Sequence, residues 1–189
     1  MAIARKAPYI HACIAGGDER ERRHDVRGSG AEAAIGDSMK GGPDWGQLTL
    51  DIHVAARTKV PVLISAPPDC AVNVARAIAA FADEWKASHI VVCNCAGGDD
   101  LGTAVASTRS VGGRRASEVI LVLQEVHALS AADQAVVARL VAAWHAGQNT
   151  PRLISTSSES LFDRVRQGLF DGQLFYSLNA LHIVLREIP

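Results

Sequence analysis

Short apolar runs alternate with helical patterns along the chain from Ala31 onward. The runs that predict strands are VPVLIS (60–65), HIVVCN (89–94), EVILVL (118–123), PRLIST (151–156) and LHIVL (181–185). Consecutive apolar positions are typical of strands that are buried on both faces, whereas strands with one wet face alternate apolar and polar residues. The pattern therefore predicts a three-layer α/β sandwich around a mainly parallel five-stranded sheet.

The segments between these runs place apolar residues at helical spacing. The predicted inward positions are Leu48, Ile52 and Ala55 or Ala56 in residues 48–58, Val74, Ile78, Phe81 and Trp85 in residues 71–86, and Val136, Val137, Leu140 and Trp144 after Ser130. Ser130 and Asp133 have the spacing of a capping box, and Gly147 is expected to end that helix. A shorter helix within residues 157–168 is expected to end at Gly168.

Composition divides the chain into an arm and a core. Residues 1–30 contain the charged, glycine-punctuated stretch GGDERERRHDVRGSG, which cannot bury much apolar surface and predicts a flexible or loosely docked arm. Acidic residues alternate with its arginines, so a solvated linker is favoured over a basic arm that binds nucleic acid. Residues 31–189 are expected to form one globular core.

Charge and hydropathy narrow the expected partners and compartment. The formal net charge of −1 gives no argument for binding nucleic acid or a membrane surface. No run approaches the roughly 18 apolar residues of a membrane span, and the first residues lack a signal-peptide pattern. We therefore expect a cytoplasmic protein with no membrane contact.

The cysteines favour neither disulfides nor metal. Cys13, Cys70, Cys93 and Cys95 are too few and too irregularly spaced for a disulfide framework. The CNC motif has one residue between its cysteines and no second pair at finger spacing, so buried thiols are favoured over a zinc site. We expect no metal and no cofactor.

The turn SAPPDCA (65–71) carries the most informative local chemistry. It joins a buried strand to a helix, the position in which a phosphate-binding loop normally lies, yet it contains no glycine and no lysine. Pro67 and Pro68 have no backbone N–H to donate. Asp69 adds a negative charge, and like charges at about 4 Å repel by roughly 4 kcal/mol near a surface. We expect this turn to reject a triphosphate, and we interpret Asp69 as the N-cap of the following helix.

Several segments together resemble the central AAA+ ATPase domain of the bacterial sigma-54-dependent activators. They are AIGDSM (34–39), PVLI with its turn and VARAI, NCA (94–96), EVILVLQEVHALS, RLIST and the closing GLFDGQLFYSLNALHIVLREIP (168–189). The resemblance covers roughly residues 34–189, and LFYSLNALHI is its most specific part. It implies the P-loop NTPase, AAA+ α/β subdomain, and the family's functional positions can be compared with this sequence one by one.

Those positions depart from the family pattern at every part of its active site. Where the family has a G-x-x-x-x-G-K phosphate loop, this chain has the shorter turn with Ala66, Pro67, Pro68 and Asp69, and Ala71 aligns with the lysine. Gln124 replaces the metal-binding aspartate, and an amide is a poor Mg²⁺ ligand beside water. Glu125 survives, and we leave open whether it is a surface or capping carboxylate or an inherited relic. Ser158 aligns with the sensing asparagine, and the family's intersubunit arginines fall at Leu169, Asp171 and Ser177.

Two larger departures concern the family's partners. Residues 96–118 are too short for the helical insertion and the GAFTGA loop that contact the sigma factor, and we expect a loop there. Its Arg109, Arg114 and Arg115 indicate either a basic patch for an anionic partner or, more simply, a mobile solvated loop. The chain stops at LREIP, about where the family's helical lid begins, so the lid and its arginine are expected to be missing. No helix-turn-helix follows, and direct DNA binding is not expected.

The leading hypothesis from these residues is a catalytically inactive AAA+ core, a pseudo-ATPase that modulates transcription or another assembly through protein contacts. Its partner would be a sigma-54 activator or a second copy of the chain. A second hypothesis is a binding module whose pocket over the strand ends accepts a ligand without a triphosphate, such as a nucleoside or cyclic nucleotide. A third is an unrelated enzyme built on an activated Cys70 thiol and His127.

Overall fold

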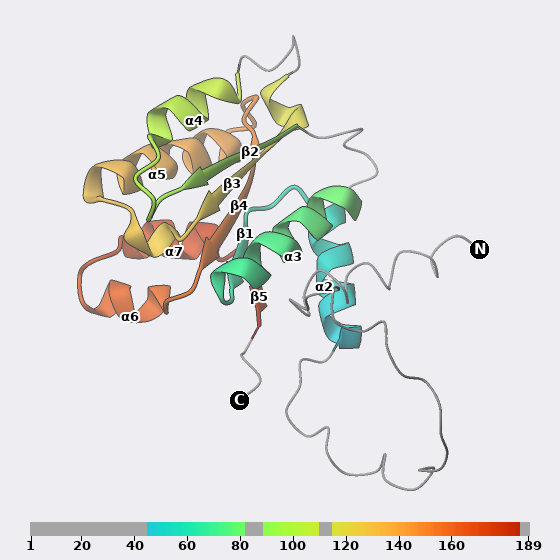
Figure 1. Ribbon diagram of the computed structural model, residues 1–189. Coiled ribbons are helices and arrows are strands. Elements are labelled where there is room, and N and C mark those ends of the chain that lie inside the picture. The colour runs from blue at the N-terminus through green and yellow to red at the C-terminus, as the bar shows by residue number, and fades with distance from the viewer. Residues whose placement is uncertain (1–44, 82–88, 110–114, 186–189) are drawn as a thin grey trace, which may run out of the picture.

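Five strands, each parallel to its neighbours, form one sheet in the order β2-β3-β4-β1-β5 (Figure 1). The computed structural model describes residues 45–81, 89–109 and 115–185. The strands are β1 (Val62–Ser65), β2 (His89–Asn94), β3 (Val119–Gln124), β4 (Arg152–Ser157) and β5 (Leu181–Val184). Their bounds lie within one residue of the predicted runs, except that β1 begins two residues later than predicted, and the parallel sheet is confirmed.

Helices cover both faces of this sheet (Figure 1). On one face lie α2 (Trp45–Arg57) and α3 (Pro68–Phe81). They share an apolar core with β1 and with those residues of β3 and β4 whose side chains point to this face of the sheet. On the other face lie α4 (Leu101–Ser107), α5 (Ala131–His145), α6 (Leu161–Arg166) and α7 (Gly172–Leu178), which share a second core. Two single-turn 3-10 helices, η1 (Ala116–Glu118) and η2 (Val126–Ala128), flank β3. The predicted three-layer sandwich is therefore confirmed.

Some sequence predictions fall outside the described residues. They are the arm over residues 1–30, the AIGDSM segment, Cys13, Trp85 and Arg114. The division of the chain into an arm and a core stays a prediction.

The α2 and α3 predictions hold for most of the core positions. Leu48, Ile52, Ala55 and Ala56 of α2 and Val74 and Ile78 of α3 are all buried. Phe81 is only partly buried, because it lies at the last residue of α3 and packs its ring 4.6 Å from that of His53.

The inward face of α5 differs from its prediction. Gln134, Val137 and Val141 are the buried residues of this helix, whereas Val136, Leu140 and Trp144 are only partly buried. Because one of the buried positions is the polar Gln134, the apolar residues alone predicted a face of α5 that is rotated about the helix axis from the buried one. Its N-terminus matches the prediction, since the Ser130 Oγ accepts from the Asp133 N–H at 3.2 Å. Gly147 and Gly168 have φ of 70° and 72°, as expected for residues that end helices.

The expectation of a loop over residues 96–118 is wrong for its middle part. Residues 101–107 form α4, whose N-cap Asp100 accepts from the Gly102 and Thr103 backbone N–H groups. Leu101 is buried, and Ala104 and Val105 pack against the same core, so an apolar stripe at i, i+3 and i+4 holds the helix on the sheet. Neighbouring glycine, serine and threonine residues hid this short stripe.

Candidate functional site

An open cavity of about 690 Å³ lies over the carboxyl ends of β1, β4 and β5. Its walls come from the turn after β1, the segment after β4 and the end of β5; they include Ser65, Ala66, Pro67, Pro68, Ser157, Ser158, Glu159, Phe162, His182 and Val184. Open α/β sheets bind ligands in the crevice at the carboxyl ends of their strands. The structure thus places a cavity where the sequence predicted a pocket.

The turn after β1 has a geometry set by its two prolines. Ala66 is buried and its N–H donates to the Ser157 carbonyl oxygen at 3.2 Å, which fixes the turn against β4. Helix α3 begins at Pro68, a residue that suits the first helical position because its φ is fixed and no N–H is needed there. Asp69 is consequently the second residue of the helix and exposed. The prediction that Asp69 is the N-cap is wrong.

Ala71, which aligns with the family's lysine, does not reach the cavity. Its N–H donates to the Pro67 carbonyl oxygen at 2.9 Å, and its side chain is fully buried in the core shared by α2, α3 and the sheet. Any longer side chain at this position would have to enter that core. The start of α3 therefore offers the cavity two prolines and no cation, and Asp69 lies beside them outside the cavity walls.

Glu125 is buried immediately after β3, with 9% of its surface exposed. Its Oε2 lies 3.3 Å from the Ser158 backbone N, accepts from the Ser158 hydroxyl, and is 3.4 Å from His127 Nδ1. Its side chain makes no capping hydrogen bond to η2. The alternative of a surface or capping carboxylate is therefore wrong. Its Oε1 has no hydrogen-bond partner among the described residues.

The backbone of Glu125 is also unusual. It has φ 54° and ψ 52°, the left-handed region, and it is the non-glycine residue with positive φ in the described part of the chain. Such a conformation costs a non-glycine residue of order 1–3 kcal/mol and persists where surrounding contacts fix it. The preceding Gln124 is half-buried, and neither Gln124 nor Glu125 contributes to the walls of the cavity. Ser158 links the buried carboxylate to the cavity.

His127 joins two carboxylates and a serine. Its Nδ1 lies 3.3 Å from the Ser157 Oγ, and its Nε2 lies 3.5 Å from a carboxylate oxygen of Glu159. A serine, a histidine and an acid in contact form the set used in nucleophilic catalysis. Here the Ser157 hydroxyl donates to the Glu159 carbonyl oxygen at 2.7 Å, and the residue is 1% exposed. A buried hydroxyl committed in this way is not placed to attack a substrate.

The third hypothesis finds no support in the geometry. Cys70 packs against the core on the α2 and α3 face, whereas His127 belongs to η2 and contacts Glu125, Ser157 and Glu159. Among the residues that the structure describes, no interaction joins the Cys70 thiol to the His127 ring.

The positions aligned with the family's intersubunit arginines have structural contacts. Asp171 caps α7 by accepting from the Leu174 N–H at 2.6 Å, and its own N–H donates to the Gln134 Oε1 at 2.8 Å. The Gln134 amide nitrogen donates to the Leu169 carbonyl oxygen at 3.1 Å. The Ser177 hydroxyl donates to the Gln173 carbonyl oxygen at 2.8 Å.

A histidine that sequence reasoning missed lies on the cavity wall. The His182 Nε2 is 2.8 Å from the Ser65 Oγ, because the parallel register of β1 and β5 pairs Ser65 with the strand that carries His182. Partial burial lowers the pKa of His182 below its usual range. The sequence shows this residue only as part of an apolar run, so the register was needed to find it.

The prediction of buried thiols is confirmed for Cys93 and holds only in part for Cys95. Cys93 is buried, and burial raises the pKa of its thiol. Cys95 is partly buried, and burial followed by the neighbouring Cys93 raises its pKa to about 12. No three His, Cys, Asp or Glu side chains within residues 45–81, 89–109 and 115–185 gather as a metal site would require.

The strand order, the turn between β1 and α3 and the acid after β3 define an α/β fold of the P-loop NTPase class. Residues 43–188 match the model of the Sigma-54 interaction domain, and the chain belongs to this family. No curated protein matches the chain. None of the helices described here is both long and apolar enough to span a membrane.

Solved structures agree on the fold. NtrX from Brucella abortus in complex with ADP aligns with a TM-score of 0.61 and 23% identity over 77% of this chain and 37% of the NtrX chain. The P-loop NTPase domain of the Sigma-54 transport activator from E. coli gives 0.57 and 17% identity over 74% of this chain and 94% of that domain. The Thermotoga maritima RuvB Holliday junction branch migration motor gives 0.52 and 17% identity over 74% of this chain and 43% of RuvB. This chain thus spans well under half of the NtrX and RuvB chains.

Proposed function

We propose that this chain is a catalytically inactive domain of the sigma-54 activator type, a pseudo-ATPase that acts in the cytoplasm through protein contacts in transcription regulation. The observation that carries the proposal is the start of α3. Pro67 and Pro68 provide no N–H groups to the cavity, Asp69 adds an exposed carboxylate, and the position aligned with the lysine is buried as Ala71. A triphosphate at the start of α3 would lie near the Asp69 carboxylate and would find neither the lysine nor the backbone N–H groups of a phosphate loop there.

The acid after β3 supports the same proposal. The Glu125 carboxylate faces Ser158 and His127 through Oε2, and it does not line the cavity. A general base must lie within hydrogen-bond reach of the water that it activates. Gln124, in place of the metal-binding aspartate, supplies a neutral amide instead of the charged oxygen that Mg²⁺ prefers.

Exposed apolar side chains on α6, on α7 and on the segment between them support a function in protein contacts. Phe162, Leu169 and Tyr176 are 53%, 54% and 71% exposed. Large apolar residues that gather on a surface mark interaction sites more often than isolated ones do. The proposed partner is a sigma-54 activator or a second copy of this chain, with no direct contact to DNA and no membrane contact.

Calorimetric titration with ATP and ADP in the presence of Mg²⁺ tests the loss of nucleotide binding. We expect no heat of binding at millimolar nucleotide, whereas the E. coli P-loop NTPase domain serves as a control of similar fold measured in the same buffer. Micromolar binding to this chain would overturn the proposal. So would ATP hydrolysis that the Glu125→Gln substitution abolishes.

The 690 Å³ cavity favours a second candidate function, the binding of a nucleoside or cyclic nucleotide. Ser65, Ser158 and His182 provide neutral hydrogen-bonding groups on its walls, and Phe162 provides an aromatic ring. A thermal shift caused by adenosine or cyclic AMP and lost in His182→Ala would support this function. Equal shifts in wild type and His182→Ala would contradict it, and Tyr176→Ala, which lies outside the cavity walls, is the matched control.

A further inference from the structure

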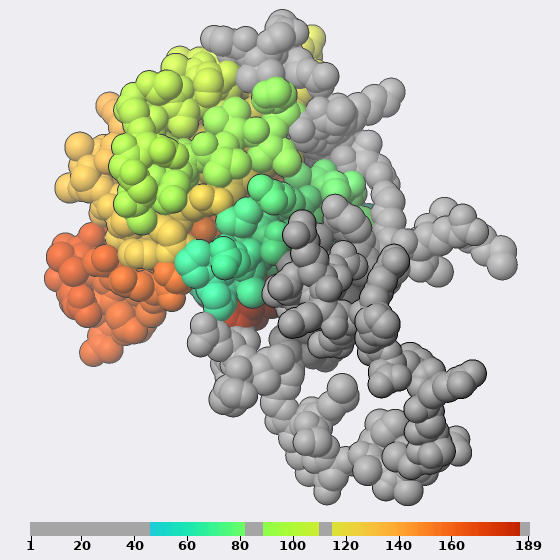
Figure 2. Space-filling view, in the orientation of Figure 1, coloured from blue at the N-terminus to red at the C-terminus, as the bar shows by residue number. Residues whose placement is uncertain are grey.

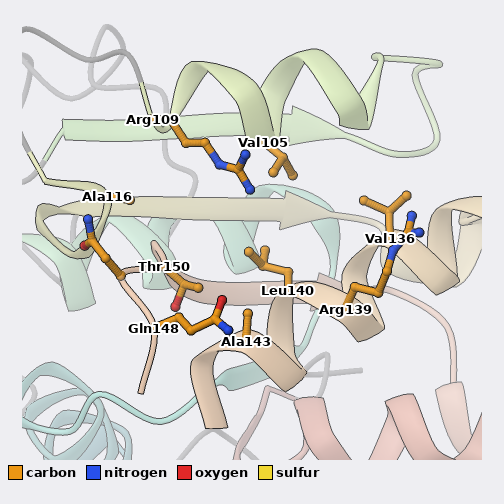
Figure 3. A pocket seen from close by; sticks show the side chains of 10 residues that line it. Val105, Arg109, Ala116, Val136, Arg139, Leu140, Ala143, Gln148 and Thr150 are labelled. Atoms are coloured by element: carbon orange, nitrogen blue, oxygen red, sulfur yellow. The ribbon is translucent and has the colours of Figure 1, made fainter. Parts of the chain in front are cut away.

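A second cavity, of about 660 Å³, lies between α4 and α5, at the amino-terminal edge of β3 and β4 (Figure 3). It is at the opposite edge of the sheet from the strand-end cavity, and the two share no residue. Its size falls in the range of small-molecule sites, about 300–1,000 Å³. The displacement of Leu140 from the buried stripe of α5 has its explanation here, because this side chain forms part of the cavity wall.

Two arginines reach this cavity from different elements. Arg109 follows the end of α4 and Arg139 lies on α5, and both side chains contribute to the wall of the cavity (Figure 3). The described residues of the wall include no aspartate or glutamate. No ion pair joins either guanidinium to an acid within the part of the chain that the structure describes. Two guanidinium groups on one cavity wall give it a positive potential that favours an anion.

Polar and apolar groups divide the rest of the wall. The segment Gln148, Asn149 and Thr150 forms a polar rim before β4, and the Asn149 Oδ1 accepts from the Ser117 N–H at 2.8 Å, which holds the rim against η1. The Thr150 Oγ1 is buried without a hydrogen-bond partner among the described residues. Leu140 and its neighbours on α5 provide apolar surface.

We propose that this cavity binds a small organic dianion with an apolar body, either a phosphate monoester or a dicarboxylate. The guanidinium groups of Arg109 and Arg139 bind its charged oxygens, for which their planar sets of N–H donors are suited. The apolar body lies on α5 beside Leu140. This site is independent of the proposed loss of ATPase function, since it lies away from the start of α3.

Phenyl phosphate and isophthalate, each titrated into the purified chain by calorimetry and thermal shift, test the site. We expect both to bind and to raise the melting temperature, with benzyl alcohol, their neutral analogue, giving no shift. The probe that binds more tightly shows whether the site prefers a phosphate monoester or a dicarboxylate. Failure of both probes to bind at 10 mM, or equal binding of the neutral analogue, would overturn the proposal.

Three substitutions locate the binding. Arg109→Gln and Arg139→Gln should each weaken phenyl phosphate about tenfold, the effect of one charge-assisted hydrogen bond. Ala143→Phe should abolish binding by placing a ring in the space that the apolar body occupies beside Leu140, without changing charge. Arg166→Gln removes an arginine that is 70% exposed and 3.9 Å from Asp163 on α6, and should leave the affinity unchanged. Circular dichroism confirms that each variant is folded.

Two results would contradict a specific site for a small dianion. Equal weakening by Arg166→Gln would mean that the probe senses only overall charge, and would overturn a specific site. Binding of a poly-glutamate peptide that depends on Arg109 and Arg139, with no binding of either small dianion, would replace the small ligand by an acidic protein segment. Loss of phenyl phosphate binding in Ala143→Phe, with Arg166→Gln unaffected, is the result that the proposal requires.

Discussion

The guanidinium of Arg152, buried in strand β4, donates a hydrogen bond to the backbone carbonyl oxygen of Ala55 at the end of helix α2. Its second terminal nitrogen donates to the Ala56 carbonyl oxygen at 3.4 Å. The last carbonyls of a helix have no partner within the helix, and a cation is favourable beside them. Burial lowers the pKa of Arg152 to about 10. This side chain therefore fastens α2 to the centre of the sheet. On the face of the molecule that Figure 2 shows, the green atoms of α3 and the yellow-green atoms of residues 89–109 form the surface over the interior.

Replacement of Arg152 should loosen α2. Arg152→Ala is expected to destabilise the chain by about 3 kcal/mol, because it removes hydrogen bonds to buried carbonyls and leaves a cavity. Arg152→Met fills most of that volume and should cost about half as much. Urea unfolding measures both values, and hydrogen exchange of the α2 amides reports the local effect. Wild-type stability in Arg152→Met would show that these hydrogen bonds contribute nothing net.

Gln134 holds the corner between α6 and α7. Its side-chain nitrogen donates to the carbonyl oxygens of Leu129 and Leu169, and its oxygen accepts from the Asp171 N–H. Gln134→Leu keeps the volume but leaves these buried groups without partners, so we expect a loss of about 2–4 kcal/mol. Gln134→Glu keeps the acceptor and loses both donations. In chemical denaturation, the free energy of unfolding of Gln134→Leu and of Gln134→Glu should lie below that of wild type. The control substitution Gln173→Leu, at an exposed position on α7, should leave it near the wild-type value.

The fold was predictable because its signals are local. Each strand of this sheet is a short apolar run, and Ser130, Gly147 and Gly168 mark helix ends by their own chemistry. Strands that are buried on both faces need helices on both sides of the sheet, so the apolar runs predicted a parallel sheet inside a three-layer sandwich. Helix α4 was missed because its stripe of three apolar residues is shorter than two turns and lies among glycine, serine and threonine.

The site was predictable only in part, because its contacts join residues far apart in sequence. The prolines after β1 and the replacement of lysine by Ala71 are visible as letters. The position of Asp69 inside the helix depends on Pro68 starting it. The burial of Glu125 depends on Ser158 and His127, and the placement of His182 beside Ser65 depends on strand register. The structural roles of Gln134 and Arg152 could not be predicted either, because most of their hydrogen-bond partners lie far away in the sequence.

Restoring the lysine of the family pattern should not restore nucleotide binding. Ala71 is fully buried in the core under α3, so Ala71→Lys forces a charged chain into apolar surroundings. We expect a loss of stability of about 3 kcal/mol or more and no ATP binding. Asp69→Lys introduces the same residue at an exposed position two residues earlier and should cost less than about 1 kcal/mol. Thermal unfolding and ATP titration of both variants measure this; tight ATP binding by Ala71→Lys would contradict the geometry.

The Cys95 thiol should be inert and should make stability depend on alkaline pH. Its pKa, raised to about 12 by burial and by Cys93, means that the folded state favours the protonated thiol. Alkylation by iodoacetamide at pH 8 should therefore be at least about a hundredfold slower in the folded chain than in urea, because the thiolate is the nucleophile. Peptide mass spectrometry reads the modification at Cys95 separately from the other cysteines.

The sign of the pH effect follows from the same shift. A group whose pKa is raised on folding contributes stability below its unfolded pKa, near 9 for this thiol, and loses that contribution as pH rises toward about 12. Wild type should thus lose more stability between pH 8 and pH 10 than Cys95→Ala does. Urea titrations at the two pH values measure the difference. Identical pH dependence in the two chains, or Cys95 alkylation as fast in the folded as in the unfolded state, would mean that the thiol is not shielded by the end of β2.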